Sequence, residues 1–272
     1  MTGQEKDRRP WLPDALRFPL ASFLAALRFL TIVPLAWRCE QDGRFFTASL
    51  AWFPVIGLLI GLACAALIAG LIPFFPPPVV AVAAIVLLAG ASGCLHLDGL
   101  ADSGDGLLSA RSRERILEIM RDSHTGAMGV IALVLVLLGK FAALSSLGSL
   151  AGSTLIFTLI AMPLAGRCAI VLTMACLPYA REGEGLGRLF YSPSSRWAAL
   201  WAVALLAAVL ACGGWRMVLP VLVAVALTVF LFSLWCRNKI GGATGDTLGA
   251  VCELTEMMVA VAMTFGTQGI NN

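Results

Sequence analysis

A series of long apolar stretches constrains this chain more than any other feature of its sequence. A helix needs about 20 apolar residues to cross the roughly 30 Å hydrocarbon core of a bilayer. We predict seven spans, at 48–72, 79–95, 126–147, 153–175, 197–211, 217–236 and 247–267. Only 13% of the residues are charged, against about 25% in soluble domains. The sequence therefore predicts an all-α, polytopic bundle of membrane helices.

The apolar stretch 18–37 is ambiguous, because Arg28 lies near its middle and Pro19 and Pro34 bracket it. On insertion scales, a central arginine costs a lipid-exposed span about 2.5–3.5 kcal/mol. We therefore favour an N-terminal helix that lies along the interface with its apolar face towards the lipid. The alternative is an eighth span whose Arg28 faces the bundle.

The basic residues predict the orientation of the bundle. Eleven lysines and arginines fall in the loops on one side, at 38–47, 96–125, 176–196 and 237–246. The opposite loops, 73–78, 148–152 and 212–216, contain only Arg216. The positive-inside rule places the first set in the cytoplasm. The net charge of +3 is scattered along the chain, so we expect no nucleic-acid partner.

The first polar cluster begins at His96 and contains Asp98, Asp102 and Asp105. This spacing puts the three aspartates within about 60° of one another on a helix. Like charges so placed repel, and the hard cation Mg²⁺, which prefers oxygen ligands, would neutralise them. The intervening small residues would let a bulky ligand approach the backbone. The alternative is a solvated acidic helix start, favoured by the helix dipole.

The segment that follows predicts a short amphipathic helix at the cytoplasmic surface, within 111–122. Its arginines, including Arg121, would bind either lipid headgroups or substrate phosphates. Asp122 is a candidate for a further metal ligand. His124 is a candidate base or phosphate contact, although a lone interfacial histidine is more often a hydrogen-bonded surface residue.

The second polar cluster opens the last span with glycines. Its candidate anion-binding residues are Gly241, Gly242, Thr244 and Gly245, and Asp246 follows them. Glycines at a helix N-terminus expose backbone N–H groups to an anion, which the helix dipole also attracts. Asp246 in the same loop suggests a metal ion shared with that anion.

Charged residues also lie within the predicted spans. Intramembrane acids are functional by default, so Glu253 and Glu256 are candidates, with Arg167 as their partner or as a phosphate contact. Lys140 lies deeper, and we expect it to snorkel towards the outer surface. Carboxylates, a glycine-rich loop and arginines that face one cavity would suit metal-dependent phosphoryl transfer on an amphiphilic substrate.

At these residues the sequence resembles the cobalamin synthase family, the adenosylcobinamide-GDP ribazoletransferases of bacteria and archaea. The similar segments are HLDGLADSGDG at 96–106, IMRDSHTG at 119–126 and GGATGDTLGA at 241–250. RFLTIVP at 28–34 and FPVIG at 53–57 add to the resemblance. It runs from about residue 20 to about 267. We therefore expect a single membrane-embedded catalytic domain at 20–272, preceded by an extension at 1–19.

The resemblance implies an Mg²⁺-dependent enzyme of the bacterial inner membrane. Its substrates would be adenosylcobinamide-GDP and α-ribazole or its 5′-phosphate, and its products adenosylcobalamin or its phosphate and GMP. We assign Asp98, Asp102, Asp105 and Asp246 to the metal, with Asp122 as a possible addition. Gly241–Gly245, Arg121, Arg167 and Glu253 are assigned to substrate, and the base is left open among His96, His124 and the aspartates. Contact with membrane lipid, and assembly into a homo-oligomer or a biosynthetic complex, are further expectations.

Two other functions compete with this one. A phosphotransferase of the CDP-alcohol type also spaces aspartates among glycines, but its first pair is three residues apart, whereas Asp98 and Asp102 are four apart. An ion-coupled transporter also has intramembrane acids and helices broken by glycine. The sequence shows no paired repeat, and its acids gather at one membrane face, which argues against the transporter.

Overall fold

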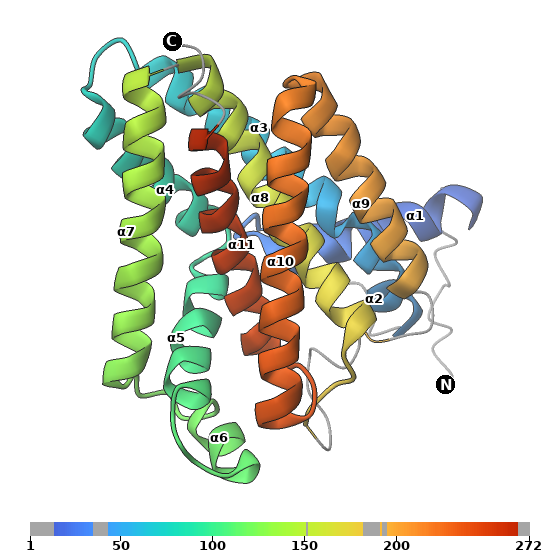
Figure 1. The fold of residues 1–272 in the computed structure, drawn as a ribbon. Coiled ribbons are helices and arrows are strands. Elements are labelled where there is room, and N and C mark those ends of the chain that lie inside the picture. The colour runs from blue at the N-terminus through green and yellow to red at the C-terminus, as the bar shows by residue number, and fades with distance from the viewer. Residues whose placement is uncertain (1–13, 35–42, 151, 182–190, 192–194, 266–272) are drawn as a thin grey trace, which may run out of the picture.

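The computed structural model describes residues 14–34, 43–150, 152–181, 191 and 195–265. In these ranges the chain is a bundle of α-helices without a β-strand (Figure 1), so the all-α prediction is confirmed. The helices are α1 Asp14–Leu30, α2 Gly43–Ser49, α3 Phe53–Leu71, α4 Pro77–Ala91, α5 Leu95–Leu107, α6 Arg113–Ile119, α7 Ala127–Leu150, α8 Gly152–Cys176, α9 Ser195–Cys212, α10 Trp215–Ile240 and α11 Gly245–Phe265. A 3₁₀ turn, Leu50–Trp52, joins α2 to α3.

Six of the described helical segments are long and apolar enough to cross a membrane, and α4 with α5 forms a seventh if that bent pair is one span. The prediction of about seven spans is therefore confirmed. The predicted span 79–95 is wrong as a continuous helix, since α4 has only 15 residues and the chain then bends by 91° into α5.

The bend between α4 and α5 has a local cause. Gly93 and Cys94 both adopt left-handed backbone conformations, with φ of 59° and 61°. The N–H of Cys94 donates to the carbonyl of Ala89 at 2.9 Å, and this contact ends α4 as left-handed residues commonly do. The aspartate-bearing segment is therefore part of the bundle, because α5 packs on α7 and α11.

Helix α8 lies at the centre of the bundle, and glycines let its neighbour α3 approach closely. A Cβ atom at Gly57 would collide with the carbonyl of Pro163, and one at Gly61 would lie 2.7 Å from the carbonyl oxygen of Ile160. Small residues at such crossings are typical of membrane helix pairs. Gly57 and Gly61 therefore mark the point where α3 crosses α8, and neither position has room for a side chain.

A pair of alanine substitutions on α3 tests this packing. We expect Gly57→Ala to destabilise the bundle by about 1–3 kcal/mol, because the added methyl group overpacks against backbone that cannot move aside cheaply. Gly70→Ala is the matched control, since its new Cβ meets nothing within 4 Å. Thermal unfolding in detergent should show a lower midpoint for the first variant alone. Equal midpoints would contradict the role of Gly57.

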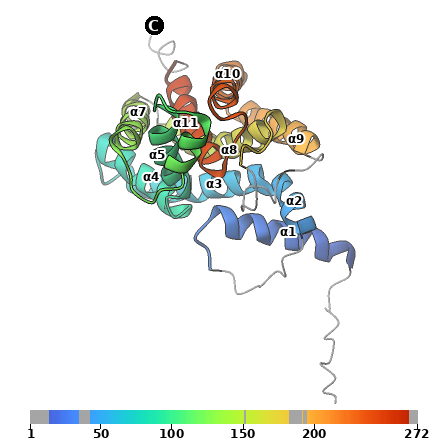
Figure 2. The same ribbon diagram turned by 90° about the horizontal axis from the view of Figure 1, so that it is seen from below.

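Helix α1 runs across the direction of the long helices and packs beside α2 and α3 (Figures 1 and 2). Its apolar part, Phe18–Leu30, is about 20 Å long, which is too short to cross a bilayer. Arg28 is exposed, so the alternative of an eighth span with Arg28 facing the bundle is wrong. The interfacial position of α1 stays a prediction, and residues 1–13 and 35–37 lie outside the described residues.

Two of the loops that we assigned to one side lie at one end of the bundle. In Figure 1, α6 and the α10–α11 turn are together at the lower end, and the α3–α4 hairpin is at the upper end. The predicted amphipathic helix corresponds to α6, whose Ile116 is buried. The arrangement therefore brings the two polar clusters of the sequence to the same end of the molecule.

Candidate active site

Helices α5 and α11 cross closely at the lower end of the bundle, and glycines on both make this possible. A Cβ atom at Gly99 would lie 2.7 Å from the carbonyl oxygen of Asp246, and one at Gly249 would lie 3.2 Å from the Cα of His96. We expected the small residues around the aspartates to leave room for a ligand. At Gly99 the space is instead filled by the backbone at the start of α11, which brings Asp246 beside α5.

Four carboxylates gather near this crossing: Asp98, Asp102, Asp105 and Asp246, here called the acidic cluster. The negative charges of the other three all act on Asp102, which is half-buried. Asp98 is exposed, and Asp246 is mostly covered, with 23% of its side chain accessible. In the described part of the chain, Arg181 is the only cation paired with a member of the cluster. The cluster therefore carries an excess of negative charge.

Asp105 is held by the start of α7. Its Oδ2 accepts a hydrogen bond from the N–H of Gly126 at 2.6 Å, and its Oδ1 accepts one from the N–H of Gly129 at 2.8 Å. These N–H groups belong to the first turn of α7 and its approach, where a helix has unpaired donors and a positive dipole end. Asp105 thus fastens α5 to α7, and its assignment as a metal ligand stays a prediction.

Asp246 is positioned by Arg181 and by the cap of α11. The Nη2 of Arg181 lies 2.6 Å from Asp246 Oδ2, and Thr244 Oγ1 donates to the same oxygen at 3.3 Å. Thr244 and Thr247 form two reciprocal hydrogen bonds. The N–H of Thr244 donates to the hydroxyl of Thr247 at 2.8 Å, and the N–H of Thr247 donates to the hydroxyl of Thr244 at 3.3 Å. This reciprocal pair is a helix N-cap. The start of α11 is therefore rigid, and it fixes Asp246 against α5.

The glycine loop is only partly free to bind an anion. The N–H of Gly241 donates to the carbonyl of Arg237 at 3.1 Å, and that of Ala243 donates to the carbonyl of Pro178 at 2.9 Å. Gly241 has a φ of 76°, which ends α10, and Gly242 packs against the carbonyl of Pro178. The loop thus joins α10 to the segment after α8, and its predicted anion-binding role stays a prediction.

Arg113 fastens α6 to the same end of the bundle. Its Nε donates to the carbonyl of Ile240 and its Nη2 to the carbonyl of Ala180, both at 2.9 Å. Lys239 adds a bond from its Nζ to the carbonyl of Ser109 at 3.2 Å. These two basic side chains therefore bind backbone carbonyls of neighbouring segments, a use that we did not foresee for them. Arg121 is exposed.

Asp122 and His124 form an exposed pair on the surface. The His124 Nδ1 lies 2.6 Å from Asp122 Oδ1, and the His124 N–H donates to the same oxygen at 3.1 Å. The ring and backbone hydrogen bonds from His124 hold the pKa of Asp122 below its usual value. The hydrogen bond to Asp122 and its charge raise the pKa of His124. In the described part of the chain, no hydrogen bond or ion pair joins this exposed pair to the acidic cluster.

A buried network of charged residues lies inside the bundle, on α7, α8 and α11. Lys140 Nζ lies 2.7 Å from Glu253 Oε2 and 2.6 Å from Glu256 Oε2, and Arg167 Nη1 lies 2.5 Å from Glu256 Oε1. The predicted pairing of Arg167 with the glutamates is confirmed. The snorkelling of Lys140 is wrong, since this residue is 3% exposed. Two cations and two anions balance one another there, as a low-dielectric interior requires.

His96 lies beside this network rather than in solvent. It is 3% exposed, and its Nδ1 is 3.4 Å from Arg167 Nη2. Arg167 and Glu253 are nearly fully buried as well. Their predicted roles as base and substrate contacts stay predictions, and the contacts seen here are with other residues of the buried region.

The acidic cluster suits a hard cation in charge and in ligand type, because oxygen ligands and excess negative charge are what Mg²⁺ requires. Across the described ranges, however, no group of three or more His, Cys, Asp or Glu side chains is arranged to hold a metal ion. A metal would therefore need Asp98, Asp102 and Asp246 to come closer together than they are in this structure.

Comparison with known proteins identifies the family. The model of the family described as cobalamin-5-phosphate synthase matches residues 22–264, which is most of the chain. This chain belongs to the cobalamin-5-phosphate synthase family. Similar proteins named adenosylcobinamide-GDP ribazoletransferase include one from Pseudomonas putida, 41% identical over 90% of this chain and 98% of its own length. Another, from Escherichia coli, is 39% identical over 89% and 98%. A third, from Roseiflexus, is 39% identical over 97% and 94%. No solved structure matches the chain.

In this member of the cobalamin-5-phosphate synthase family, the sequence analysis misplaced Lys140 and did not single out Arg181. Lys140 had a usable signal, since a charge within a span normally pairs with another, and α11 offers two glutamates. Arg181 had no signal that distinguishes it from the other arginines of the polar loops. Only the packing of the segment after α8 against the α10–α11 turn brings Arg181 to Asp246.

Proposed function

We propose that this chain transfers adenosylcobinamide phosphate from adenosylcobinamide-GDP to α-ribazole or its 5′-phosphate. Membership of the family makes the chain a transferase of cobalamin biosynthesis, and the names of its relatives support these substrates. The observation that carries the proposal is the acidic cluster at the α5–α11 crossing, with Arg181 at its edge. The family match favours this function over the CDP-alcohol phosphotransferase and the transporter.

The proposed reaction is a single displacement at phosphorus. A ribose hydroxyl oxygen of α-ribazole attacks the cobinamide-side phosphorus, the phosphoanhydride bond breaks, and GMP leaves with the bridging oxygen. The proton of the hydroxyl group passes to a base, for which we propose half-buried Asp102. Such transfers ask the protein mainly to position the reactants and to stabilise charge.

We also propose that Asp98, Asp102 and Asp246 hold Mg²⁺. When bound there, the ion would supply positive charge to the phosphate oxygens. The excess negative charge of the cluster supports this proposal. The two oxygens of Asp105 already accept backbone N–H bonds, so we give Asp105 a supporting place rather than a direct one.

The orientation is a further part of the proposal. The lower end of the bundle in Figure 1, with α6 and the α10–α11 turn, would face the cytoplasm of a bacterial inner membrane. The excess of lysine and arginine in the loops of that end supports this orientation. Adenosylcobinamide-GDP carries a charged diphosphate and α-ribazole is a polar nucleoside, so both would enter from the cytoplasm.

An activity assay tests the proposal directly. The protein purified in detergent is incubated with adenosylcobinamide-GDP, α-ribazole and Mg²⁺, and GMP and the cobalamin product are followed by chromatography. We expect equimolar formation of both products and its loss in EDTA, with recovery when excess Mg²⁺ is restored. Absence of product from folded, monodisperse protein would overturn the proposed substrates. Product formation in EDTA would overturn the proposed metal dependence and leave the proposed substrates standing.

Arg181 offers a test of the site that the sequence did not suggest. Its Nε–H is buried without a hydrogen-bond partner in the described part of the chain, so it has a donor left for a phosphate oxygen. We expect Arg181→Gln to lower kcat/KM for adenosylcobinamide-GDP by about 10²-fold, the usual loss for one charge-stabilising donor. Arg196→Gln, an exposed arginine at the start of α9, is the control and should keep full activity. Equal activity of the two variants would remove Arg181 from the site.

A further inference from the structure

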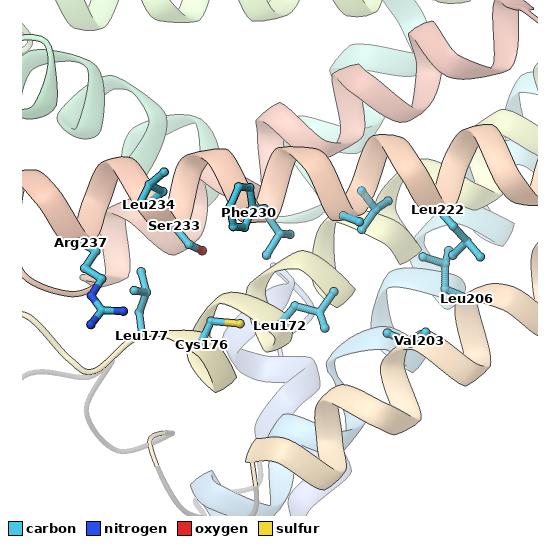
Figure 3. A pocket seen from close by; sticks show the side chains of 13 residues that line it. Leu172, Cys176, Leu177, Val203, Leu206, Leu222, Phe230, Ser233, Leu234 and Arg237 are labelled. Carbon is cyan, nitrogen blue, oxygen red and sulfur yellow. The ribbon is translucent and has the colours of Figure 1, made fainter.

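A groove unrelated to the acidic cluster lies between α8, α9 and α10. Its volume is about 520 Å³, which is within the range of ligand-binding pockets. Aliphatic side chains line most of it, among them Leu172 of α8, Leu206 of α9 and Leu222 of α10 (Figure 3). No member of the acidic cluster lines it, so the proposed transfer reaction does not account for it.

One end of the groove is polar. Ser233 is only 7% exposed, and its hydroxyl group has no hydrogen-bond partner in the described part of the chain. Figure 3 shows this hydroxyl directed into the groove, with Arg237 beyond it at the end of the groove. The two residues are one helical turn apart and share a face of α10. A buried hydroxyl without a partner costs free energy, so the groove suits an occupant with a hydrogen-bond acceptor there.

Arg237 gives that end of the groove a positive charge. Within the described ranges, no carboxylate pairs with it. Lys239 follows it in the last turn of α10, so the basic character extends along the helix end. An anionic group would therefore be held at Arg237 by a charge that no carboxylate among the described residues balances.

The length of the groove matches one leaflet of a membrane. It extends along α10 from Leu222 to Arg237, which corresponds to about 22 Å of helix. One leaflet contributes about 15 Å of hydrocarbon, and the headgroup layer lies beyond it. In a bilayer crossed by α10, Arg237 in the last turn of that helix would lie at headgroup depth, and the aliphatic lining would lie at acyl-chain depth.

We propose that this groove binds an anionic phospholipid. An acyl chain lies along the aliphatic lining, the phosphate contacts the guanidinium of Arg237, and an ester carbonyl accepts a hydrogen bond from the Ser233 hydroxyl. The lipid is a fixed component of the bundle that fills the gap between α9 and α10. This proposal does not depend on the substrates of the transfer reaction.

Native mass spectrometry of the full chain in detergent tests the proposal, with phosphatidylglycerol and phosphatidylcholine as the probes. We expect one phosphatidylglycerol molecule to be retained in preference to phosphatidylcholine. Arg237→Gln should reduce that preference about fivefold, as expected for one basic residue near a membrane surface. Arg196→Gln, which removes a charge outside the groove, should leave the preference unchanged.

A second pair of variants separates occupancy of the groove from charge. Ala226 lines the groove, whereas the adjacent Leu227 is exposed and does not. Ala226→Trp should abolish retention of the lipid, and Leu227→Trp should keep it, with unfolding midpoints measured for both. Undiminished retention by both Arg237→Gln and Ala226→Trp would overturn the proposal. So would a dimer in which a second copy of the chain fills the groove, shown by cross-linking of the Ala226→Cys variant that the wild type does not give.

Discussion

Replacement of Asp102 by asparagine should lower the rate of transfer by about 10²–10³-fold, the scale of losing one preorganised electrostatic contact in an active site. Asp102 is the carboxylate on which the charges of Asp98, Asp105 and Asp246 all act. Asparagine keeps its shape and removes its charge, so the proposed metal site loses a ligand and the proposed base is lost. The measurement is steady-state turnover at saturating Mg²⁺, with GMP as the readout.

The same substitution should not destabilise the bundle. Removing one of four mutually repelling charges relieves repulsion, so the unfolding midpoint of Asp102→Asn should equal or exceed that of the wild type. Glu118→Gln is the control, because Glu118 is exposed and forms only a surface pair with Arg115. Near-normal turnover of Asp102→Asn would show that Asp102 is neither ligand nor base. A large fall in its midpoint would show instead that it has a structural role.

Replacement of Glu256 by glutamine should destabilise the fold by about 3–5 kcal/mol, the usual cost of breaking a buried ion pair from one side. Glu256 is the partner of both Lys140 and Arg167, at 2.6 and 2.5 Å, and all three are almost fully buried. The variant leaves two cations with only Glu253 between them. Thermal unfolding in detergent should show a clearly lower midpoint than the wild type.

A double variant distinguishes charge balance from the loss of a particular side chain. Glu256→Gln combined with Lys140→Met leaves one cation, Arg167, and one anion, Glu253, and should recover part of the lost stability. The surface variant Glu118→Gln should cost less than about 1 kcal/mol. If the double variant is less stable than Glu256→Gln alone, charge balance is not what the network contributes to stability.

The acidic cluster shows how far local sequence goes in predicting a site. The spacing of Asp98, Asp102 and Asp105 placed them on one helix face, and the structure has them on α5 near Asp246. Sequence did not distinguish their partners. Asp105 accepts hydrogen bonds from the N–H groups of Gly126 and Gly129, and Asp246 forms an ion pair with Arg181. These contacts join segments from 21 to 65 residues apart, so no local pattern encodes them.

By itself the sequence determined the all-α class, the approximate number of spans and the gathering of the two polar clusters at one end. These depend on hydropathy, helix length and the distribution of charge, which are properties of each segment taken alone. Only the tertiary structure decided that α4 breaks at Gly93 and Cys94, so that the aspartates of α5 enter the bundle. It also decided that Lys140 is buried between two glutamates rather than snorkelling. The physical reason is that the effect of a charge or a glycine depends on the helix that packs against it. Which helix that is depends on the whole fold.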